Sequence, residues 1–305
     1  MSPALFEFTA VTKTYGNIRA LDNLSLRVAP GAVGLLGPNG SGKTTMIRIL
    51  LGLIPIDSGS GEVLGLDFHQ RQLDIRRQVG FAPEDECLFS HIVGVEFVAY
   101  AGELVGMSPS DALQRAHEVL DYVGLGEARY RKVESYSTGM KQRLKLASAI
   151  VHDPKLLILD EPTNGMDPAG RQEVLDLAHD LAHNKGMSLL FSSHLLPDVE
   201  AVCDYVIVLG RGKLLAQGEI QELKRLHEQS FLLRLKGDAS IFAQALAEQG
   251  CAAVLQDDLL RVQLRLDQSP QLLWELAARH NEQIRYLRPQ RSTLEEVFLN
   301  AVERA

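Results

Sequence analysis

Hydrophobic residues recur along the first 230 residues in short runs with strand-like and helix-like spacing. Residues 5–15 and 20–28 alternate apolar and polar side chains, and Val33 to Leu36 forms a short apolar run. These patterns predict strands, whereas residues 45–54 have the length and apolar spacing of a packed helix. Strand and helix patterns keep alternating after this point, which predicts a mostly parallel α/β sheet with helices on both faces.

The next part of the chain adds a helical region and further strands. Residues 87 to 135 read as mostly helical. Ser108 can cap one of these helices, followed by Pro109 in its first turn and Asp111 as the partner in a capping box. We therefore expect a helical subdomain at about 87–150. Further helices are predicted at 139–151 and 168–184, and strands at 156–159, 188–191 and 205–209.

From about residue 230 the order of elements changes. The patterns predict a strand at 231–237, a helix at 239–249, a hairpin at 251–266 turning at Gln256 to Asp258, a helix at 270–281, a strand at 283–289 and a final helix at 293–304. The order β-α-β-β-α-β predicts a small ferredoxin-like α+β domain. We place the domain boundaries at 1–228 and 229–305, and we expect Trp274, on an apolar helix face, to lie in the core.

Composition narrows the class of protein. The chain has 305 residues, 46% of them hydrophobic and 23% charged, as in soluble globular proteins with one large and one small domain. A net charge of −8 without a run of Lys and Arg argues against nucleic acid as a partner. We see no signal peptide and no apolar run near the roughly 18 residues of a spanning helix. A membrane function would therefore need another chain. Cys87, Cys203 and Cys251 have no metal-binding spacing, and we expect reduced structural thiols.

A glycine-rich loop follows the strand that ends at Leu36. Residues 37–44 read Gly-Pro-Asn-Gly-Ser-Gly-Lys-Thr and match G-x-x-x-x-G-K-[ST]. Such a loop turns backbone N–H groups toward phosphate oxygens, at the positive end of the following helix. Lys43 would reach the β and γ phosphates, and Thr44 would ligate magnesium. The rival dinucleotide fingerprint needs G-x-G-x-x-G, which this glycine spacing does not give. The predicted ATP-binding residues are Gly37, Pro38, Asn39, Gly40, Ser41, Gly42, Lys43, Thr44 and Thr45.

Two carboxylates end the apolar strand that begins at Leu156. Because neighbouring strand residues point in different directions, Asp160 can face a magnesium ion, directly or through water, while Glu161 polarises a water against the γ-phosphate. Two acids after a strand are, taken alone, more often a solvated turn. The phosphate loop upstream favours the functional interpretation.

Three further motifs make the pattern specific. Residues 136–143 read Tyr-Ser-Thr-Gly-Met-Lys-Gln-Arg, residues 161–168 read Glu-Pro-Thr-Asn-Gly-Met-Asp-Pro, and the strand at 188–191 is followed by Ser192-Ser193-His194. In this order, over about residues 5 to 225, the motifs resemble those of the ATP-binding cassette (ABC) ATPases. The resemblance implies a P-loop NTPase-type cassette with a helical subdomain.

The resemblance also implies roles for matching positions. Tyr15 would stack on adenine, although a tyrosine after a strand is, taken alone, more often a core or surface residue. The signature residues Ser137, Thr138, Gly139 and Met140 would close on the γ-phosphate held by the other subunit. His194 would contact the γ-phosphate and act in catalysis with Glu161 and Lys43. Asp167 would link the two active sites of the dimer.

Two positions depart from the family pattern. The signature reads Y-S-T-G-M where L-S-G-G-Q is usual, and Glu84 stands where glutamine is usual. That position normally senses magnesium and touches the membrane partner, so we expect a coupling role and a contact near the metal; a solvated loop acid is the alternative. A branch similar to antibiotic-efflux and sodium-efflux exporters shares the acid, the S-T-G-M form and a tail motif like Ser292 to Leu299.

The favoured function is the ATP-hydrolysing subunit of an exporter, using ATP and Mg²⁺ at the cytoplasmic face of the membrane. Its partners would be a separately encoded permease and a second copy of the chain or a related cassette. A soluble cassette ATPase in translation or chromosome maintenance is the alternative, but one cassette without long heptads fits it poorly. A module that binds ATP without turnover is disfavoured because Glu161 and His194 are both present.

Overall fold

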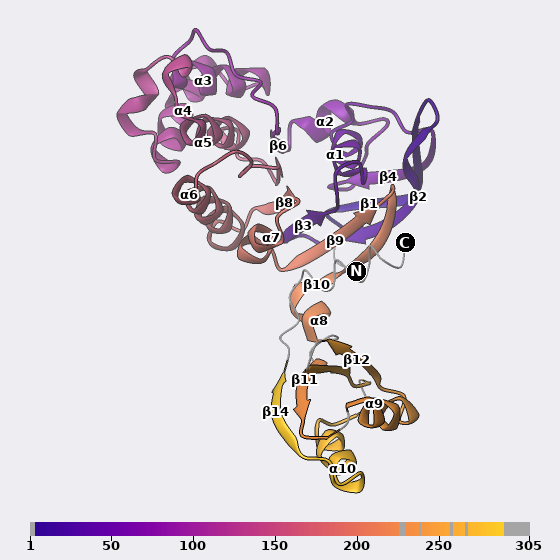
Figure 1. The fold of residues 1–305 in the computed structure, drawn as a ribbon. Coiled ribbons are helices and arrows are strands. Elements are labelled where there is room, and N and C mark those ends of the chain that lie inside the picture. Colours follow the sequence, from indigo (N-terminus) through magenta and orange to yellow (C-terminus); the bar gives the residue numbers. More distant parts are fainter. Residues whose placement is uncertain (1–3, 226–229, 238, 257–258, 266–267, 290–305) are drawn as a thin grey trace. The chain divides into compact units, whose positions relative to one another are not determined.

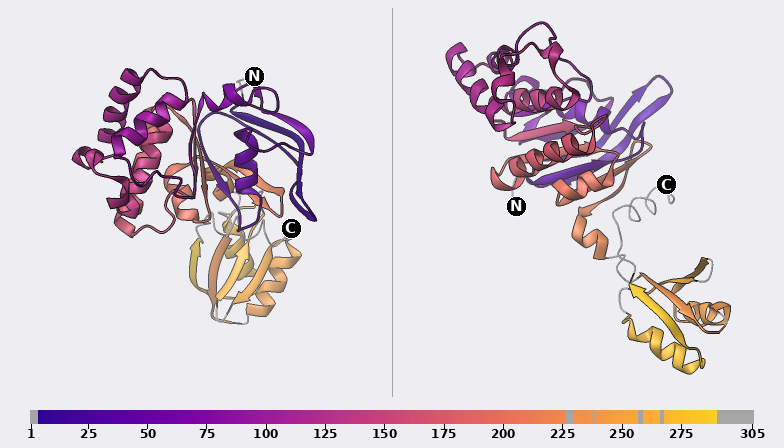
Figure 2. Two further views of the ribbon diagram at one scale, coloured as in Figure 1. Left: turned by 90° about the horizontal axis from the view of Figure 1, so that it is seen from above. Right: turned by 60° about the vertical axis from the view of Figure 1, so that its left-hand side comes forward.

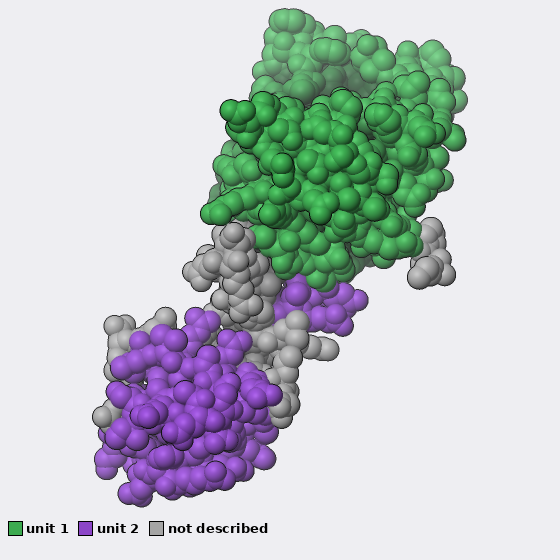
Figure 3. All heavy atoms as spheres, turned by 90° about the vertical axis from the view of Figure 1, so that its right-hand side faces the viewer, with its two compact units in different colours: residues 1–218, 305 green, residues 219–304 purple. Residues whose placement is uncertain are grey.

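A computed structural model describes residues 4–225, 230–237, 239–256, 259–265 and 268–289. The chain forms two compact units, residues 1–218 and 219–304, shown in different colours in Figure 3. The division between Gly218 and Glu219 falls somewhat before the boundary we place at residue 228. Among the described residues, no helix is long and apolar enough to span a membrane.

The first unit contains two sheets (Figure 1). The antiparallel sheet has the order β2-β1-β4-β5, with β1 at Phe6–Tyr15, β2 at Ile18–Val28, β4 at Ser58–Val63 and β5 at Leu66–Asp67. The larger sheet has the order β10-β9-β3-β8-β7-β6, with β3 at Ala32–Leu36, β6 at Val79–Ala82, β7 at Leu156–Asp160, β8 at Ser188–Ser193, β9 at Tyr205–Gly210 and β10 at Lys213–Glu219. Its strands β9, β3, β8, β7 and β6 run parallel, as expected for the α/β class.

Helix α1 (Lys43–Leu50) packs into a core that it shares with apolar residues of both sheets. Its buried side chains include Met46, Ile47 and Ile49, each of which stabilises the fold by about 1.5 to 3 kcal/mol on burial. An eight-residue helix is too short to be stable alone, so this packing holds it in place. The predicted extension to residue 54 is wrong. Gly52 adopts a φ of +62°, and the N–H groups of Gly52 and Leu53 close the helix end in a Schellman motif.

The other helices of this unit lie around the parallel sheet. Helices α3 (Gly94–Leu104), α4 (Pro109–Tyr122) and α5 (Thr138–Ile150) form the helical region, on the opposite side of the unit from the antiparallel sheet (Figures 1 and 2). Ser108 caps α4 by accepting the backbone N–H of Asp111. The remaining helices are α2 (Gln72–Arg76), α6 (Pro168–His179), which continues as a π-helical turn over Asp180–Asn184, and α7 (Leu196–Val202), which contacts β3 and β8.

The second unit has the predicted element order. After α8 (Ile220–Arg225) come β11 (Ser230–Leu235), α9 (Ala239–Glu248), β12 (Ala252–Gln256), β13 (Leu259–Gln263), α10 (Gln271–Arg279) and β14 (Ile284–Pro289). The strands form an antiparallel sheet in the order β12-β13-β11-β14, the arrangement of a ferredoxin-like fold. Its own core includes Phe231, Leu233 and Phe242.

One prediction for this unit is wrong, and another concerns residues outside the described part of the chain. Trp274 is 53% exposed, so its placement in the core is wrong; α10 buries Leu273, Leu276 and Ala277, and residue 274 lies off that helical stripe. The predicted final helix at 293–304, with the motif Ser292 to Leu299, lies outside the described residues, as do turn residues 257 and 258.

Candidate active site

Four parallel strands bring the predicted site residues to one edge of the larger sheet. Leu36 pairs with Ser193, Asp160 with Ser192, and Ala82 with Leu159. The residues that follow these strand ends are therefore neighbours, although they come from distant parts of the sequence. They surround a cavity of about 430 Å³, lined by Ile18, Ala20, Asn39, Gly40, Ser41, Gly42, Lys43, Thr44, Thr45, Glu84, Asp160, Glu161, Asn164 and His194.

The glycine loop at the end of β3 is shaped by close backbone contacts. A Cβ on Gly37 would lie 2.3 Å from Ser41 Oγ and 2.6 Å from the carbonyl oxygen of Leu209, so only glycine fits there. Gly40 and Gly42 have φ values of +78° and +108°, which other residues adopt at a cost. The loop thus turns sharply into α1 and places the helix N-terminus at the cavity, an arrangement suited to an anion.

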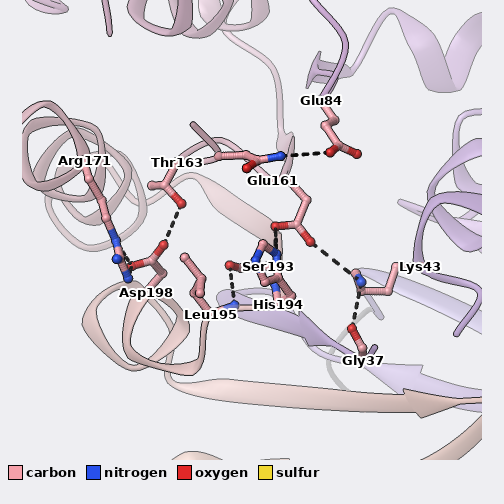
Figure 4. A network of polar contacts seen from close by, with 11 residues as sticks. Gly37, Lys43, Glu84, Glu161, Thr163, Arg171, Ser193, His194, Leu195 and Asp198 are labelled. Carbon is pink, nitrogen blue, oxygen red and sulfur yellow. Dashed lines mark hydrogen bonds and ion pairs between the residues drawn. The ribbon is translucent and has the colours of Figure 1, made fainter. Parts of the chain in front are cut away.

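Lys43 supplies a buried positive charge beside the loop. Its Nζ donates to the carbonyl oxygen of Gly37 at 2.8 Å and lies 3.7 Å from Glu161 Oε1 (Figure 4). Thr44, in the first turn of α1, is exposed and lines the cavity. The Lys43 ammonium group is therefore held at the wall of a cavity that is also lined by three carboxylates, those of Glu84, Asp160 and Glu161.

Asp160 is the most deeply buried of these carboxylates, at 3% exposed. Burial raises the pKa of Asp160, and the negative charges of Glu161 and Glu84 act in the same direction. Its buried Oδ1 has no hydrogen-bond partner within the described part of the chain. A buried carboxylate oxygen without a donor, in a cavity that Thr44 also lines, fits the oxygen ligands that magnesium prefers.

Glu161 stands between the side chains of Lys43 and His194. Its φ of +49° is uncommon for a residue with a side chain, and its N–H donates to the carbonyl oxygen of Ser192 at 3.0 Å. Glu161 Oε2 accepts the His194 backbone N–H at 3.3 Å and lies 2.7 Å from His194 Nδ1 (Figure 4). Both carboxylate oxygens are thus directed into the cavity, toward Lys43 on one side and His194 on the other.

Glu84 is exposed and lines the same cavity. Its Oε1 accepts a hydrogen bond from Asn164 Nδ2 at 3.1 Å, a contact between residues that are 80 positions apart. Asn164 lies in the loop that follows Glu161, so Glu84 is connected to the segment that bears the second carboxylate. Sequence reasoning did not identify Asn164, although it lies inside the quoted motif at 161–168.

Other predicted residues lie elsewhere. Tyr15, at the end of β1, is 45% exposed and has the Lys13 ammonium 5.5 Å from its ring centroid. The described cavity lining includes Ile18 and Ala20 from β2 but not Tyr15, Gly37 or Pro38.

The signature and the proposed dimer residue lie at two helix starts. Ser137 caps α5 and accepts the N–H of Met140 at 3.3 Å, and Ser137 and Thr138 are exposed. Asp167 occupies the cap position of α6 and is also exposed. The described cavity lining does not include residues 137–140.

A buried ionic cluster behind the site was also not anticipated. Asp198 on α7 is 0% exposed and accepts hydrogen bonds from Thr163 Oγ1 at 2.6 Å and from Arg171 Nε at 2.7 Å (Figure 4). Thr163 follows Glu161 by two residues, and α7 begins two residues after His194. The cluster therefore ties together the two segments that bear Glu161 and His194.

A phosphate-binding loop at the end of β3 and an acidic pair at the end of β7 define a P-loop nucleotide-binding protein. The family model described as ABC transporter matches residues 21–164. The chain is 42% identical over 234 residues to the uncharacterized ABC transporter ATP-binding protein YxlF of Bacillus subtilis, which covers 76% of this chain and 77% of that protein. The chain therefore belongs to the ATP-binding proteins of ABC transporters, and it is an ATPase whose activity is coupled to transport.

Two further likenesses extend this result. The daunorubicin/doxorubicin resistance ATP-binding protein DrrA of Streptomyces peucetius is 36% identical over 301 residues, which is 96% of this chain and 91% of that protein. A dimeric ATP-binding cassette in a post-hydrolysis state, bound to ADP and Pi, matches with a TM-score of 0.65 at 24% identity, covering 70% of this chain and 98% of that chain. The match to the Streptomyces protein includes the second unit. The match to the dimeric cassette shows the cassette fold.

Proposed function

We propose that this chain powers a separate membrane permease that exports a drug-like compound, and that it works as a pair of cassettes at the cytoplasmic face of the membrane. The observation that carries the proposal is the convergence of Lys43, Asp160, Glu161 and His194 on one cavity behind a phosphate loop. The relative named for daunorubicin and doxorubicin resistance, which matches along nearly the whole chain, supports the export direction.

The cavity suits ATP with magnesium. Backbone N–H groups of residues 39–45 and the charge of Lys43 would hold the phosphates. Thr44 and Asp160 would hold Mg²⁺, Asp160 directly or through water, and Glu84 lies at the same cavity wall. When bound, Mg²⁺ neutralises charge on the phosphate oxygens. Burial of Asp160 makes an unpaired negative charge costly there, which favours a cation beside it.

Glu161 is the residue placed to orient the attacking water. The Glu161 carboxylate is close to Lys43 and His194, and both of these side chains carry donors that suit phosphate oxygens. Phosphates entering the cavity would compete for these donors and leave the Glu161 oxygens free to accept a proton from water. His194 would then contact the γ-phosphate and keep Glu161 oriented through its backbone N–H.

A second cassette would complete the site. Ser137 begins α5, and this helix start presents its N–H groups at an exposed surface rather than at the chain's own cavity. Helix starts of this kind bind anions. The signature of one copy would therefore close on the γ-phosphate held by the other, with the exposed Asp167 near the junction. A cassette of the same fold is described as a dimer bound to ADP and Pi.

Purification of the full chain from its native membranes in mild detergent tests the coupling to a permease. We expect a membrane protein with about six apolar spans to co-purify in a fixed ratio, each span having the roughly 20 residues of a transmembrane helix. ATPase activity should be higher in this complex than in the chain alone. Activity that is unchanged by any co-purifying membrane protein would favour a soluble cassette ATPase in a non-transport process.

A further inference from the structure

Lys145 is a buried lysine that the mechanism above does not use. It lies on α5, eight residues after the signature serine Ser137, in the apolar stretch Leu144 to Ile150. The residue is 4% exposed. Lysine is almost never this buried unless its charge is paired or fully hydrogen-bonded, so its surroundings require an explanation.

The ammonium group of Lys145 has three partners in one loop. Its Nζ donates to the carbonyl oxygens of Pro83 at 2.5 Å, Glu84 at 3.1 Å and Asp85 at 3.2 Å. An ammonium has three donors, so these three consecutive carbonyls satisfy all of them. The backbone of residues 83–85 therefore curves around the group, and the loop conformation depends on it.

The local charges fit this arrangement. Burial lowers the pKa of Lys145, and the neighbouring Cys87, Asp85, Glu86 and Glu84 oppose that effect. A neutral side chain of the same length would leave three carbonyl oxygens without their donor. Leaving these carbonyl oxygens without a donor is costly. The loop would therefore leave its present conformation for others in which the oxygens have partners.

The loop that Lys145 holds is the one that carries Glu84 into the active site. The Glu84 side chain accepts a hydrogen bond from Asn164, in the segment after Glu161 (Figure 4). A continuous set of contacts therefore runs from the signature helix through Lys145 to the loop, and from the loop through Glu84 and Asn164 to the catalytic segment. Along α5, Ser137 and Lys145 are about 12 Å apart, at 1.5 Å per residue.

We propose that Lys145 is a positioning residue that fixes Glu84 in the active site from the helix bearing the signature. The inference rests on the proposed roles of Glu84 and Ser137. It goes beyond them by identifying the side chain that connects the signature helix to the loop carrying Glu84. Lys145 itself touches neither ATP nor the reacting atoms.

The variant K145M keeps the length of the side chain and removes its charge and donors. We expect kcat for ATP hydrolysis by the full-length chain to fall about 10-fold or more, as when outer partners of an active-site ligand are removed. The KM for ATP should change by less than about threefold, because the phosphate loop is untouched. The matched control is E86Q, which breaks the exposed Lys141–Glu86 ion pair between the same helix and the same loop. It should stay within about twofold of wild type.

A double-mutant cycle with E84A tests whether Lys145 acts through Glu84. We expect E84A to lower kcat, and E84A/K145M to be no worse than the poorer single variant, because the two changes remove one shared effect. K145R, which keeps charge and donors, should recover activity to within about threefold of wild type. If K145M does not fold, K145R replaces it in the cycle with E84A. Any decrease in kcat caused by K145R should then not add to the decrease caused by E84A.

Three results would overturn the inference. They are a kcat for K145M equal to that of wild type, losses that multiply in the cycle, or the same loss in E86Q as in K145M. Each of them requires an active wild-type chain. A wild-type chain without ATPase activity would instead contradict the proposed function, so the two failures are distinguishable.

Discussion

Lys43 is a cationic side chain beside the phosphate loop: its Nζ donates to the carbonyl oxygen of Gly37 and lies 3.7 Å from Glu161 Oε1. The cavity also contains the carboxylates of Asp160 and Glu84. Adding the negative charge of ATP phosphates to this cavity without Lys43 would be strongly unfavourable. We therefore regard ATP affinity, and not only turnover, as dependent on this one residue.

The variant K43A should lose ATP affinity by about 10- to 100-fold, the range for one hydrogen bond to a charged group. Isothermal calorimetry with ATP and magnesium measures this directly. The control K155A removes an exposed lysine next to the start of β7, at the opposite end of that strand from Asp160, and should bind ATP as wild type does. Unchanged affinity in K43A would mean that nucleotide binds elsewhere.

The sequence predicts individual site residues best where those residues are neighbours along the chain. Residues 39–45, after β3, and the pair Asp160 and Glu161, at the end of β7, line the cavity and could be identified because each group is contiguous in the sequence. Asn164, Asp198 and Lys145 were not predicted, since each acts through a partner 35 to 80 positions away. For Lys145 the only local signal is a lysine inside an otherwise apolar helix face.

Segments that bear the catalytic residues are held together by packing between elements. The buried carboxylate of Asp198 on α7 accepts hydrogen bonds from Arg171 on α6 and from Thr163 in the loop between β7 and α6. Removing one partner of such a pair leaves a buried charge or donor uncompensated. The cluster should therefore contribute to stability as well as to the alignment of Glu161 and His194.

The variant D198A is expected to lower the free energy of unfolding by about 3 kcal/mol, the lower end of the range for breaking a buried ion pair, because Arg171 keeps some solvent contact. Urea denaturation followed by circular dichroism measures the change. The control D176A removes an exposed acid from α6, and we expect a change within about 0.5 kcal/mol. Equal stability of the two variants would show that the cluster is not structural.

At the element scale, strongly periodic segments were predicted and weakly apolar ones were not. The parallel strands β3, β7, β8 and β9 are short apolar runs, and α4 has a complete capping signal. Strand β4, with the sequence Ser-Gly-Ser-Gly-Glu-Val, has almost no apolar pattern and is held as a strand by its pairing with β1 and β5. Helix α1 was extended too far because the apolar spacing continues through Gly52, where the backbone turns.

The whole molecule consists of two units with separate cores. The sequence after residue 230 contains no second phosphate loop and no second acid pair placed like Asp160 and Glu161. We therefore propose that the second unit regulates or stabilises assembly and takes no part in the chemistry. A sensor that binds a small ligand is the alternative function for it, and the fold alone does not decide between them.

Deleting residues 230–305 should leave a folded cassette, because a domain with its own core can fold alone. We expect the truncated chain to bind ATP within about threefold of the full-length affinity, since the groups that set that affinity are all retained. Fluorescence titration with a labelled nucleotide compares the two chains. A truncation that is folded and monodisperse but binds no ATP would show that the second unit completes the site.

The central claim is that Glu161 activates water for ATP hydrolysis in the cavity at the end of β7, and the variant E161Q tests it most directly. Phosphate release by E161Q should be about 100- to 10,000-fold slower than that of wild type, the usual loss on removing a general base. ATP affinity should be close to that of wild type, and size-exclusion chromatography with ATP should show a persistent dimer. Phosphate release by E161Q at the wild-type rate would contradict the account.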